Sequence, residues 1–297
     1  MPSTDHARLM ALLRARPLPR DLSIHARRVA FGKLADLFPL PRDVDVTRAR
    51  MGGRPSEWLS CPGVRHDRVV LYLHGGAYVV GSCATHRELA ARIGRACGAR
   101  VLLPEYRLAP EWPFPAALED SLAAVNDLEA SGCPARQIAV VGDSAGGGLA
   151  VATLCALRDQ GAGMPACGVA LSPWTDLAAT GPSLWHFQAR DPLLDSETLR
   201  RTALLYLNGA NPRDPRASPL YADLRSLPPL LLQCGSADVL HDDASRLAER
   251  ARAAGVAVTL EIWDQMVHVW HLFAQQLTEG RTACERVGAF VRAQFPT

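Results

Sequence analysis

Short apolar runs alternate with stretches of helical periodicity from about residue 68 to the end of the chain. The apolar runs predict strands at 69–73, 100–103, 138–141, 168–171, 230–234 and 256–262. The periodicity between them predicts helices at 86–97, 115–129, 145–159, 242–254 and 278–295. Because strands that are apolar along their whole length must be covered on both faces, the pattern indicates an α/β fold, with a mostly parallel sheet between two layers of helices.

Two segments depart from this alternation. The first fifty residues show helical spacing at 6–14 and 24–37, so we expect amphipathic helices there and no strand. Between Pro173 and Pro228, about 55 residues contain no convincing strand, where a parallel crossover would need only a dozen or so. The helical candidates in this interval are 183–189 and 196–207.

The length of the second interval indicates an inserted helical cap. The N-terminal helices have no sheet partner of their own, so we place them against this cap. The expected organisation is N-terminal helices in 1–50 that contribute to the cap, a main α/β domain formed by 51–175 together with 226–297, and inserted cap helices in 176–225.

Composition narrows the class of protein. The 297 residues are 48% hydrophobic and 21% charged, which is ordinary globular usage. The net charge of +2 is too small to attract nucleic acid through its long-range field. Lys33 is the only lysine, and Ala30 stands three residues before it, so a Schiff-base lysine, a phosphate-loop lysine and a Ser-x-x-Lys pair are all excluded.

The spacing of the cysteines and the lengths of the apolar runs indicate the cellular compartment of the protein. Eight cysteines contain no Cys-x-x-Cys pair, which argues against a zinc ribbon or a redox motif and favours small core residues. The apolar run 9–13 is too short for a signal-peptide core, and no stretch approaches the ~18 apolar residues of a membrane span. We therefore expect a cytoplasmic protein with reduced thiols.

The strongest chemical signal is Gly142-Asp143-Ser144-Ala145-Gly146, between a predicted strand and a predicted helix. A serine at such a sharp turn is held in a strained backbone conformation that projects its hydroxyl, and the small flanking residues avoid collisions. A glycine-rich turn or a phosphate-binding loop are the alternatives, but neither Gly-x-Gly-x-x-Gly nor a lysine is present. We interpret Ser144 as a nucleophile.

A second signal, His74-Gly75-Gly76-Ala77, follows the strand predicted at 69–73. Small residues with free amides at a strand end can aim N–H groups at an oxyanion, and the amide of Ala145 would complete the hole. A tight turn is the simpler alternative, because Gly-Gly is common turn chemistry.

A serine nucleophile needs a base, and the base needs an acid that fixes its tautomer. In a sheet enzyme of this kind the chain order is Ser, then Asp or Glu, then His. Asp238 follows the strand predicted at 230–234, and His268 follows the one at 256–262. Both therefore fit that order.

Competing residues lie close to both positions. Asp242 and Asp243 follow Asp238, but their place suggests helix capping and dipole stabilisation. His271 lies three residues beyond His268 and is an alternative base. The two histidines could also be metal ligands, but no third ligand clusters with them, and we expect neither a metal nor a cofactor.

Five blocks together identify a resemblance. They are His74-Gly75-Gly76, Tyr106-Arg107-Leu108-Ala109-Pro110-Glu111 with Phe114-Pro115-Ala116-Ala117, Gly142-Asp143-Ser144-Ala145-Gly146-Gly147, Ser172-Pro173-Trp174 and Met266-Val267-His268. In their order and spacing, over about residues 68 to 295, they resemble the hormone-sensitive lipase family of bacterial esterases, also called family IV.

The resemblance implies an α/β-hydrolase fold, a cap, and hydrolysis of short- to medium-chain carboxylic esters without a cofactor. It assigns Ser144 as nucleophile, His268 as base and Asp238 as acid. It assigns the oxyanion amides to Gly75, Gly76, Ala77 and Ala145.

Two residues depart from the family pattern. Ala77 stands where the family usually has a third glycine, and Trp112 where a polar residue such as His is more frequent. The added methyl group of Ala77 lies beside the acyl or alcohol site and could shift selectivity. Arg107 is interpreted as part of a buried hydrogen-bonded network away from the substrate.

Alternatives to ester hydrolysis stay open at this point. An amidase, a lactonase or a deacetylase could use the same triad, and some proteins of this fold are non-catalytic small-molecule receptors. Trp185, Phe187, Leu204 and Tyr206 are candidates to line an apolar pocket. The expected partner is a small-molecule ester, and the segment 256–295 could form the edge of a homodimer.

Overall fold

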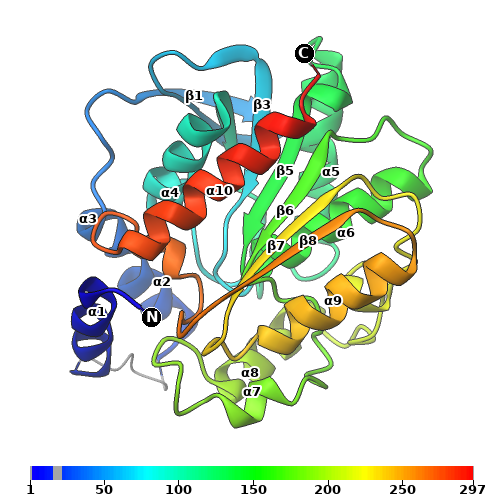
Figure 1. The fold of residues 1–297 in the computed structure, drawn as a ribbon. Coiled ribbons are helices and arrows are strands. Elements are labelled where there is room, and N and C mark those ends of the chain that lie inside the picture. The colour runs from blue at the N-terminus through cyan, green and yellow to red at the C-terminus, as the bar shows by residue number, and fades with distance from the viewer. Residues whose placement is uncertain (1, 16–21, 297) are drawn as a thin grey trace.

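A computed structural model describes residues 2–15 and 22–296, and in them eight strands form one sheet of order β1-β2-β4-β3-β5-β6-β7-β8 (Figure 1). β1 and β2 pair antiparallel, β2 pairs antiparallel with β4, and all further pairs are parallel. The strands are β1 Asp45–Met51, β2 Arg54–Ser60, β3 Arg65–Leu73, β4 Ala99–Pro104, β5 Ile138–Asp143, β6 Cys167–Leu171, β7 Leu230–Gly235 and β8 Val258–Trp263.

Helices cover both faces of the sheet. They are α1 Thr4–Ala15, α2 Ile24–Gly32, α3 Leu34–Leu37, α4 Cys83–Cys97, α5 Ala116–Ala130, α6 Ala145–Asp159, α7 Ser183–His186, α8 Ser196–Leu207, α9 His241–Ala253 and α10 Thr278–Gln294, with 3-10 turns η1 Ala135–Gln137, η2 Pro219–Tyr221 and η3 Trp270–Phe273. The exposed Lys33 joins α2 to α3. Among the described residues, no helix combines the length and the apolar character that a bilayer crossing requires.

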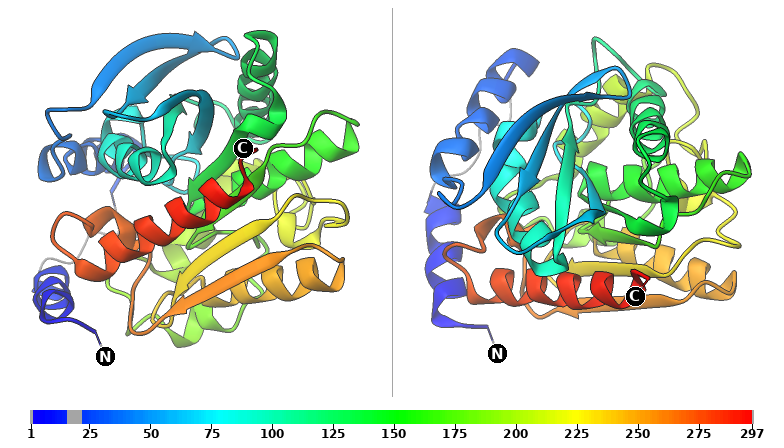
Figure 2. Two further views of the ribbon diagram at one scale, coloured as in Figure 1. Left: turned by 45° about the horizontal axis from the view of Figure 1, so that its top comes forward. Right: turned by 90° about the horizontal axis from the view of Figure 1, so that it is seen from above.

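The alternation of side chains along β3 divides the core into two layers. Val69, Leu71 and Leu73 pack in the layer that also contains residues of α5, α6 and α9. Val70 and Tyr72 pack in the layer beneath α4 and α10. All five side chains are fully buried, so β3 has no solvent-exposed face over this stretch, as the continuous apolar run predicts. Figure 2 shows α4 and α10 together on one side of the sheet.

The six strands predicted from apolar runs are all present, and the α/β fold is confirmed. The expectation of no strand in the first fifty residues is wrong, because β1 begins at Asp45. β1 is an edge strand, and most of its residues are exposed. An edge strand joined to its neighbour mainly through backbone hydrogen bonds leaves no apolar run in the sequence, and β2, with Arg54, Pro55 and Glu57, leaves none either.

The helices at the carboxyl edge of the sheet come from two separate parts of the chain. α7 and α8 belong to the segment 172–229 between β6 and β7, here called the insertion, and lie below the sheet in Figure 1. α1 and α2 come from the N-terminal part: residues of α2 and α8 line one pocket, whereas α1 lies farther away, at the left of Figure 1. α1 is fastened to the main domain by polar contacts, since Ser3 bonds Glu279 and Asp5 bonds Thr278 at the start of α10.

Candidate active site

Ser144 lies in a sharp turn between β5 and α6. Its backbone has φ 52° and ψ −122°, a conformation that costs an L-residue free energy. Backbone hydrogen bonds on both sides fix the turn: the Ser144 N–H donates to the Leu171 carbonyl at 2.8 Å, and the Trp174 N–H donates to the Ser144 carbonyl at 2.9 Å. A Cβ at Gly146 would collide with the carbonyl oxygens of Leu73 and His74, so only glycine fits at position 146.

The structure brings Ser144, His268 and Asp238 into one hydrogen-bonded chain. His268 Nδ1 lies 3.2 and 3.3 Å from the two carboxylate oxygens of Asp238, and Nε2 lies 2.9 Å from Ser144 Oγ. An ionised carboxylate can only accept, so Nδ1 carries the proton and donates it to Asp238. Nε2 is then the acceptor for the hydroxyl of Ser144, which is the arrangement that general-base activation requires.

Electrostatics favour an ionised acid beside the imidazole. Burial alone would raise the pKa of Asp238, but the positive charge of His268 and hydrogen bonds from His268, Ser172 and the Leu240 N–H lower it. Burial alone would lower the pKa of His268, but the charge and hydrogen bond of Asp238 outweigh this and raise it. The charge of Asp238 therefore favours the protonated form of His268.

The segment after β3 turns back on itself beside Ser144. Gly76, Ala77 and Tyr78 all have positive φ, at 119°, 52° and 63°. Within the described residues, no acceptor is bonded to the N–H of Gly76, Ala77 or Ala145. The N–H of Gly75 has a different partner, because it donates to Asp143 Oδ1 at 3.0 Å. Gly75 is therefore not a free oxyanion donor in this arrangement.

The carboxylate of Asp143 holds this segment through a hydrogen bond from the Gly75 N–H. Besides Gly75, its carboxylate accepts a hydrogen bond from Tyr72 at 2.8 Å and lies 3.5 Å from the ring of His86. Burial acts to raise the pKa of Asp143, but His86, Tyr72 and His74 outweigh it and lower the pKa. Asp143 is thus held as an anion that binds the segment after β3 to the end of β5.

The competing residues have other partners. His271 is fully buried, its Nε2 lies 2.8 Å from Gln233 Oε1, and burial lowers its pKa to about 3, so it is a neutral structural histidine. Asp242 accepts from the Ser183 N–H, and Asp243 accepts from the N–H groups of Thr175 and Asp176. Both carboxylates fasten the insertion instead of capping α9, whose N-cap, Leu240, makes no side-chain cap.

Asp191 was missed by reasoning from the sequence. It lies in the insertion, is 3% exposed, and its Oδ2 accepts a hydrogen bond from the His268 N–H at 3.0 Å. No motif marks this residue, because the contact joins positions 77 apart in the chain. Only the folded arrangement of the insertion shows it.

The hydrogen-bonded network expected around Arg107 is present. Its guanidinium donates hydrogen bonds to Asp120 and Glu119. The side chain is 23% exposed, so the network is half-buried and not fully buried as expected. The guanidinium also lies 5.7 Å from the ring of Trp112, which is exposed. This cation–π contact gives a physical role to the tryptophan that departs from the family pattern.

The four pocket candidates do not form one pocket. Tyr206 is buried in the core, where it stacks on Tyr78 with ring centroids 3.8 Å apart. Leu204 and Trp185 are exposed, and Phe187 is half-buried beneath the guanidinium of Arg190. Tyr206 therefore packs in the core, whereas the other three lie at or near the surface.

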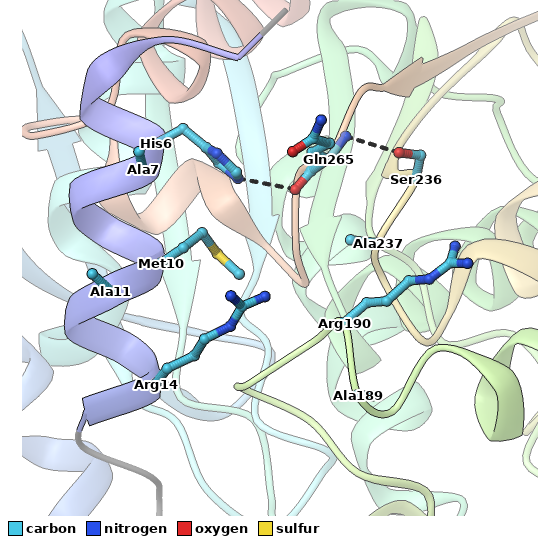
Figure 3. A pocket seen from close by; sticks show the side chains of 10 residues that line it. All are labelled: His6, Ala7, Met10, Ala11, Arg14, Ala189, Arg190, Ser236, Ala237 and Gln265. Carbon is cyan, nitrogen blue, oxygen red and sulfur yellow. Dashed lines mark hydrogen bonds between the residues drawn. The ribbon is translucent and has the colours of Figure 1, made fainter.

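A cavity of about 590 Å³ lies between α1 and the loops that follow β7 and β8 (Figure 3). One wall is α1, and the opposite wall contains Ser236 and Ala237, which directly precede Asp238, together with Gln265. His6 of α1 donates to the Gln265 carbonyl across this space, at 3.0 Å. Ser144, Asp238 and His268 are not among the residues that line this cavity, although Ala237 directly precedes Asp238.

Residues 70–272 match a family model described as the alpha/beta hydrolase fold. The chain is 48% identical to an acetyl-hydrolase of Streptomyces hygroscopicus over 277 residues, which are 92% of this chain and 91% of that protein. It is 33% identical to an esterase of Acinetobacter venetianus over 275 residues, which are 92% of this chain and 90% of that protein.

Solved structures agree with these similarities. The crystal structure of an esterase from the bacterial hormone-sensitive lipase family superposes with a TM-score of 0.96, at 48% identity and with 100% of both chains covered. An esterase/lipase from an uncultured bacterium superposes with a TM-score of 0.95, at 42% identity and with 99% of each chain covered.

The packing of the turn predicts the effect of one added methyl group. Gly146→Ala should lower catalytic turnover by about 10²-fold or more, because the methyl group displaces the Ser144 turn by a fraction of an ångström or more. Gly32→Ala is the matched control, since a Cβ at the end of α2 meets nothing within 4 Å. Steady-state kinetics and thermal melting of both variants test this, and a fully active Gly146→Ala enzyme would contradict the geometry.

Proposed function

Because the chain belongs to the hormone-sensitive lipase family of α/β-hydrolases and is a carboxylic ester hydrolase, we propose that Ser144, His268 and Asp238 form its catalytic triad. The observation that carries this proposal is the continuous hydrogen-bonded chain from Asp238 through His268 to Ser144. The strained turn that presents Ser144 supports it.

The first half of the reaction is acylation of Ser144. His268 Nε2 takes the hydroxyl proton while Oγ attacks the ester carbonyl carbon, and the carbonyl oxygen becomes an oxyanion. His268 then gives the proton to the departing alkoxide, which leaves as an alcohol. Asp238 stays ionised throughout and stabilises the imidazolium.

The oxyanion is stabilised by backbone N–H groups. Gly76, Ala77 and Ala145 are the proposed donors, because their amides have no other partner in the described residues. Each such donor is worth roughly 3 kcal/mol in the transition state. Gly75 supports them indirectly, since its bond to Asp143 fixes the segment in place.

The second half of the reaction is deacylation. Water attacks the acyl-enzyme by the same steps, and the carboxylic acid is released.

The proposed substrates are small esters with short to medium acyl chains. The methyl group of Ala77, where the resembling enzymes have glycine, adds bulk beside the acyl or alcohol site. The name of the acetyl-hydrolase relative supports the short end of this range and favours deacetylation as the second candidate function. An amide or a lactone would use the same groups, because the triad does not distinguish the leaving group.

Three further expectations remain proposals. The main domain is 51–175 with 226–297, and the helices of 1–50 and 176–225 form its cap. The eight cysteines are buried and free, which supports a reducing, cytoplasmic location. A homodimer would use β8, which lies at the end of the sheet and exposes 41% of Ile262.

Removing the nucleophile tests the triad directly. Ser144→Ala should fold with an unchanged melting temperature and lose p-nitrophenyl butyrate turnover by roughly 10⁶-fold, because Ser144 is the only hydroxyl among the described residues that is hydrogen-bonded to His268 Nε2. The matched control is Ser131→Ala, at an exposed serine whose Oγ bonds only the Asp127 carbonyl at the end of α5. Activity that persists in Ser144→Ala would show that the nucleophile is a different group.

The pH dependence of kcat/KM tests the base. His268 must be neutral to accept a proton, and its pKa is raised in the folded protein, so activity should fall as pH drops through a value above the ordinary ~6.5 of histidine. Asp238→Asn should move this limb to lower pH and reduce kcat by about 10⁴-fold. A limb at or below pH 6.5 in the unmodified enzyme contradicts the assignment.

A panel of esters separates the candidate substrates. Rates should be highest for p-nitrophenyl acetate and butyrate, low for palmitate and negligible for p-nitroacetanilide, which carries the same leaving-group ring on an amide. Rates on butyrate should show no jump when its solubility limit is exceeded. A jump there would favour an interfacial lipase, and efficient cleavage of the anilide would favour an amidase.

A further inference from the structure

Asp191 connects the insertion to the backbone of the proposed base. Its two carboxylate oxygens accept separate backbone hydrogen bonds, Oδ2 from the His268 N–H at 3.0 Å and Oδ1 from the Leu193 N–H at 2.9 Å. The side chain is 3% exposed, and the bond to His268 is buried, whereas the bond to Leu193 is part-buried. Loss of the carboxylate would leave the buried His268 N–H without an acceptor.

The backbone after His268 needs such support. Val269 has φ 44° and ψ 47°, the left-handed region that a β-branched residue rarely adopts. Its N–H donates to Ser172 Oγ at 3.0 Å. Asp191 and Ser172, which is the first residue after β6, therefore hold two consecutive N–H groups, and this fixes the direction of the His268 side chain.

The charge of Asp191 also acts on His268. Burial and the nearby charge of Asp238 raise the pKa of Asp191 to about 7, while His268 and the two backbone donors act in the opposite direction. Three carboxylates, Asp238, Asp191 and Asp143, favour the charged imidazole. The adjacent His271 is neutral and does not offset them.

We propose that Asp191 is a positioning residue that keeps His268 Nε2 directed at Ser144 Oγ. Turnover then depends on the insertion being packed against the sheet. The proposal rests on the proposed roles of Ser144 and His268. The carboxylate acts through the backbone of His268, and none of its hydrogen bonds reaches Ser144.

Two substitutions at this position separate positioning from folding. Asp191→Ala should lower kcat by about 10²-fold with KM within threefold, because the imidazole loses its fixed direction while substrate binding is retained. Asp191→Asn keeps an oxygen that can accept from the His268 N–H, so it should recover at least tenfold of that loss. It should also move the acid limb of kcat/KM to lower pH, because the negative charge is gone.

Asp195→Ala is the matched control. Asp195 also lies in the insertion and accepts from the Thr198 N–H at the start of α8, but it has no contact with His268. Its loss should lower the melting temperature while kcat stays within twofold. If Asp191→Ala and Asp195→Ala reduce kcat equally, or if Asp191→Asn leaves the acid limb unchanged, the proposal is overturned. The asparagine variant decides the matter if the alanine variant does not fold.

The rate of labelling by an organophosphate distinguishes this proposal from the one on which it rests. The unmodified protein should be labelled at Ser144, and Asp191→Ala should be labelled about 10²-fold more slowly because His268 is misdirected. Absence of labelling in the unmodified protein would refute the proposed function. Labelling of Asp191→Ala at the unmodified rate would refute only the role of Asp191.

Discussion

Hydrogen bonds from backbone N–H groups to buried carboxylates hold the loops at the carboxyl edge of the sheet. Loops have no ladder of their own, so each buried N–H needs another acceptor, and a carboxylate offers several lone pairs at one point. Asp143 fixes the oxyanion segment through Gly75, Asp238 binds the Leu240 N–H, and Asp243 binds the two residues after Trp174. The sheet places these loops near one another, and the carboxylates fix their relative positions.

The same carboxylates differ in charge because their donors differ. Asp143 and Asp238 each accept a hydrogen bond from a hydroxyl group and lie beside a histidine. Their pKa values are therefore lowered despite burial. Asp243 has mainly backbone donors and a second carboxylate, Asp176, nearby, so burial and that charge raise its pKa to about 8. Charge is therefore concentrated where the proposed reaction develops an imidazolium, and is weaker where a carboxylate only holds loops together.

Most of the fold, Ser144 and Asp238 followed from local patterns and chain order, whereas the choice of His268 over His271 rested mainly on the family resemblance. Continuous apolar runs predicted the parallel strands because burial on both faces leaves a trace in the sequence, and Ser144 stood out because its turn admits only small neighbours. β1 and β2 left no such trace, since an edge hairpin depends on backbone pairing. The contacts of Asp191 and Gly75 could not be predicted, because each joins residues about 70 positions apart that only the finished fold brings together.

The single lysine has a practical consequence. Lys33 is exposed at the junction of α2 and α3 and carries the only side-chain amine of the chain, while the other basic positions are arginines that do not react with activated esters or aldehydes under mild conditions. Coupling at a pH where the side-chain amine reacts would therefore join the protein to a support through Lys33, with the α-amino group as the one competing amine. Every molecule coupled through a side chain would share one tether between α2 and α3, and an aldehyde support would leave the hydroxyl of Ser144 unmodified.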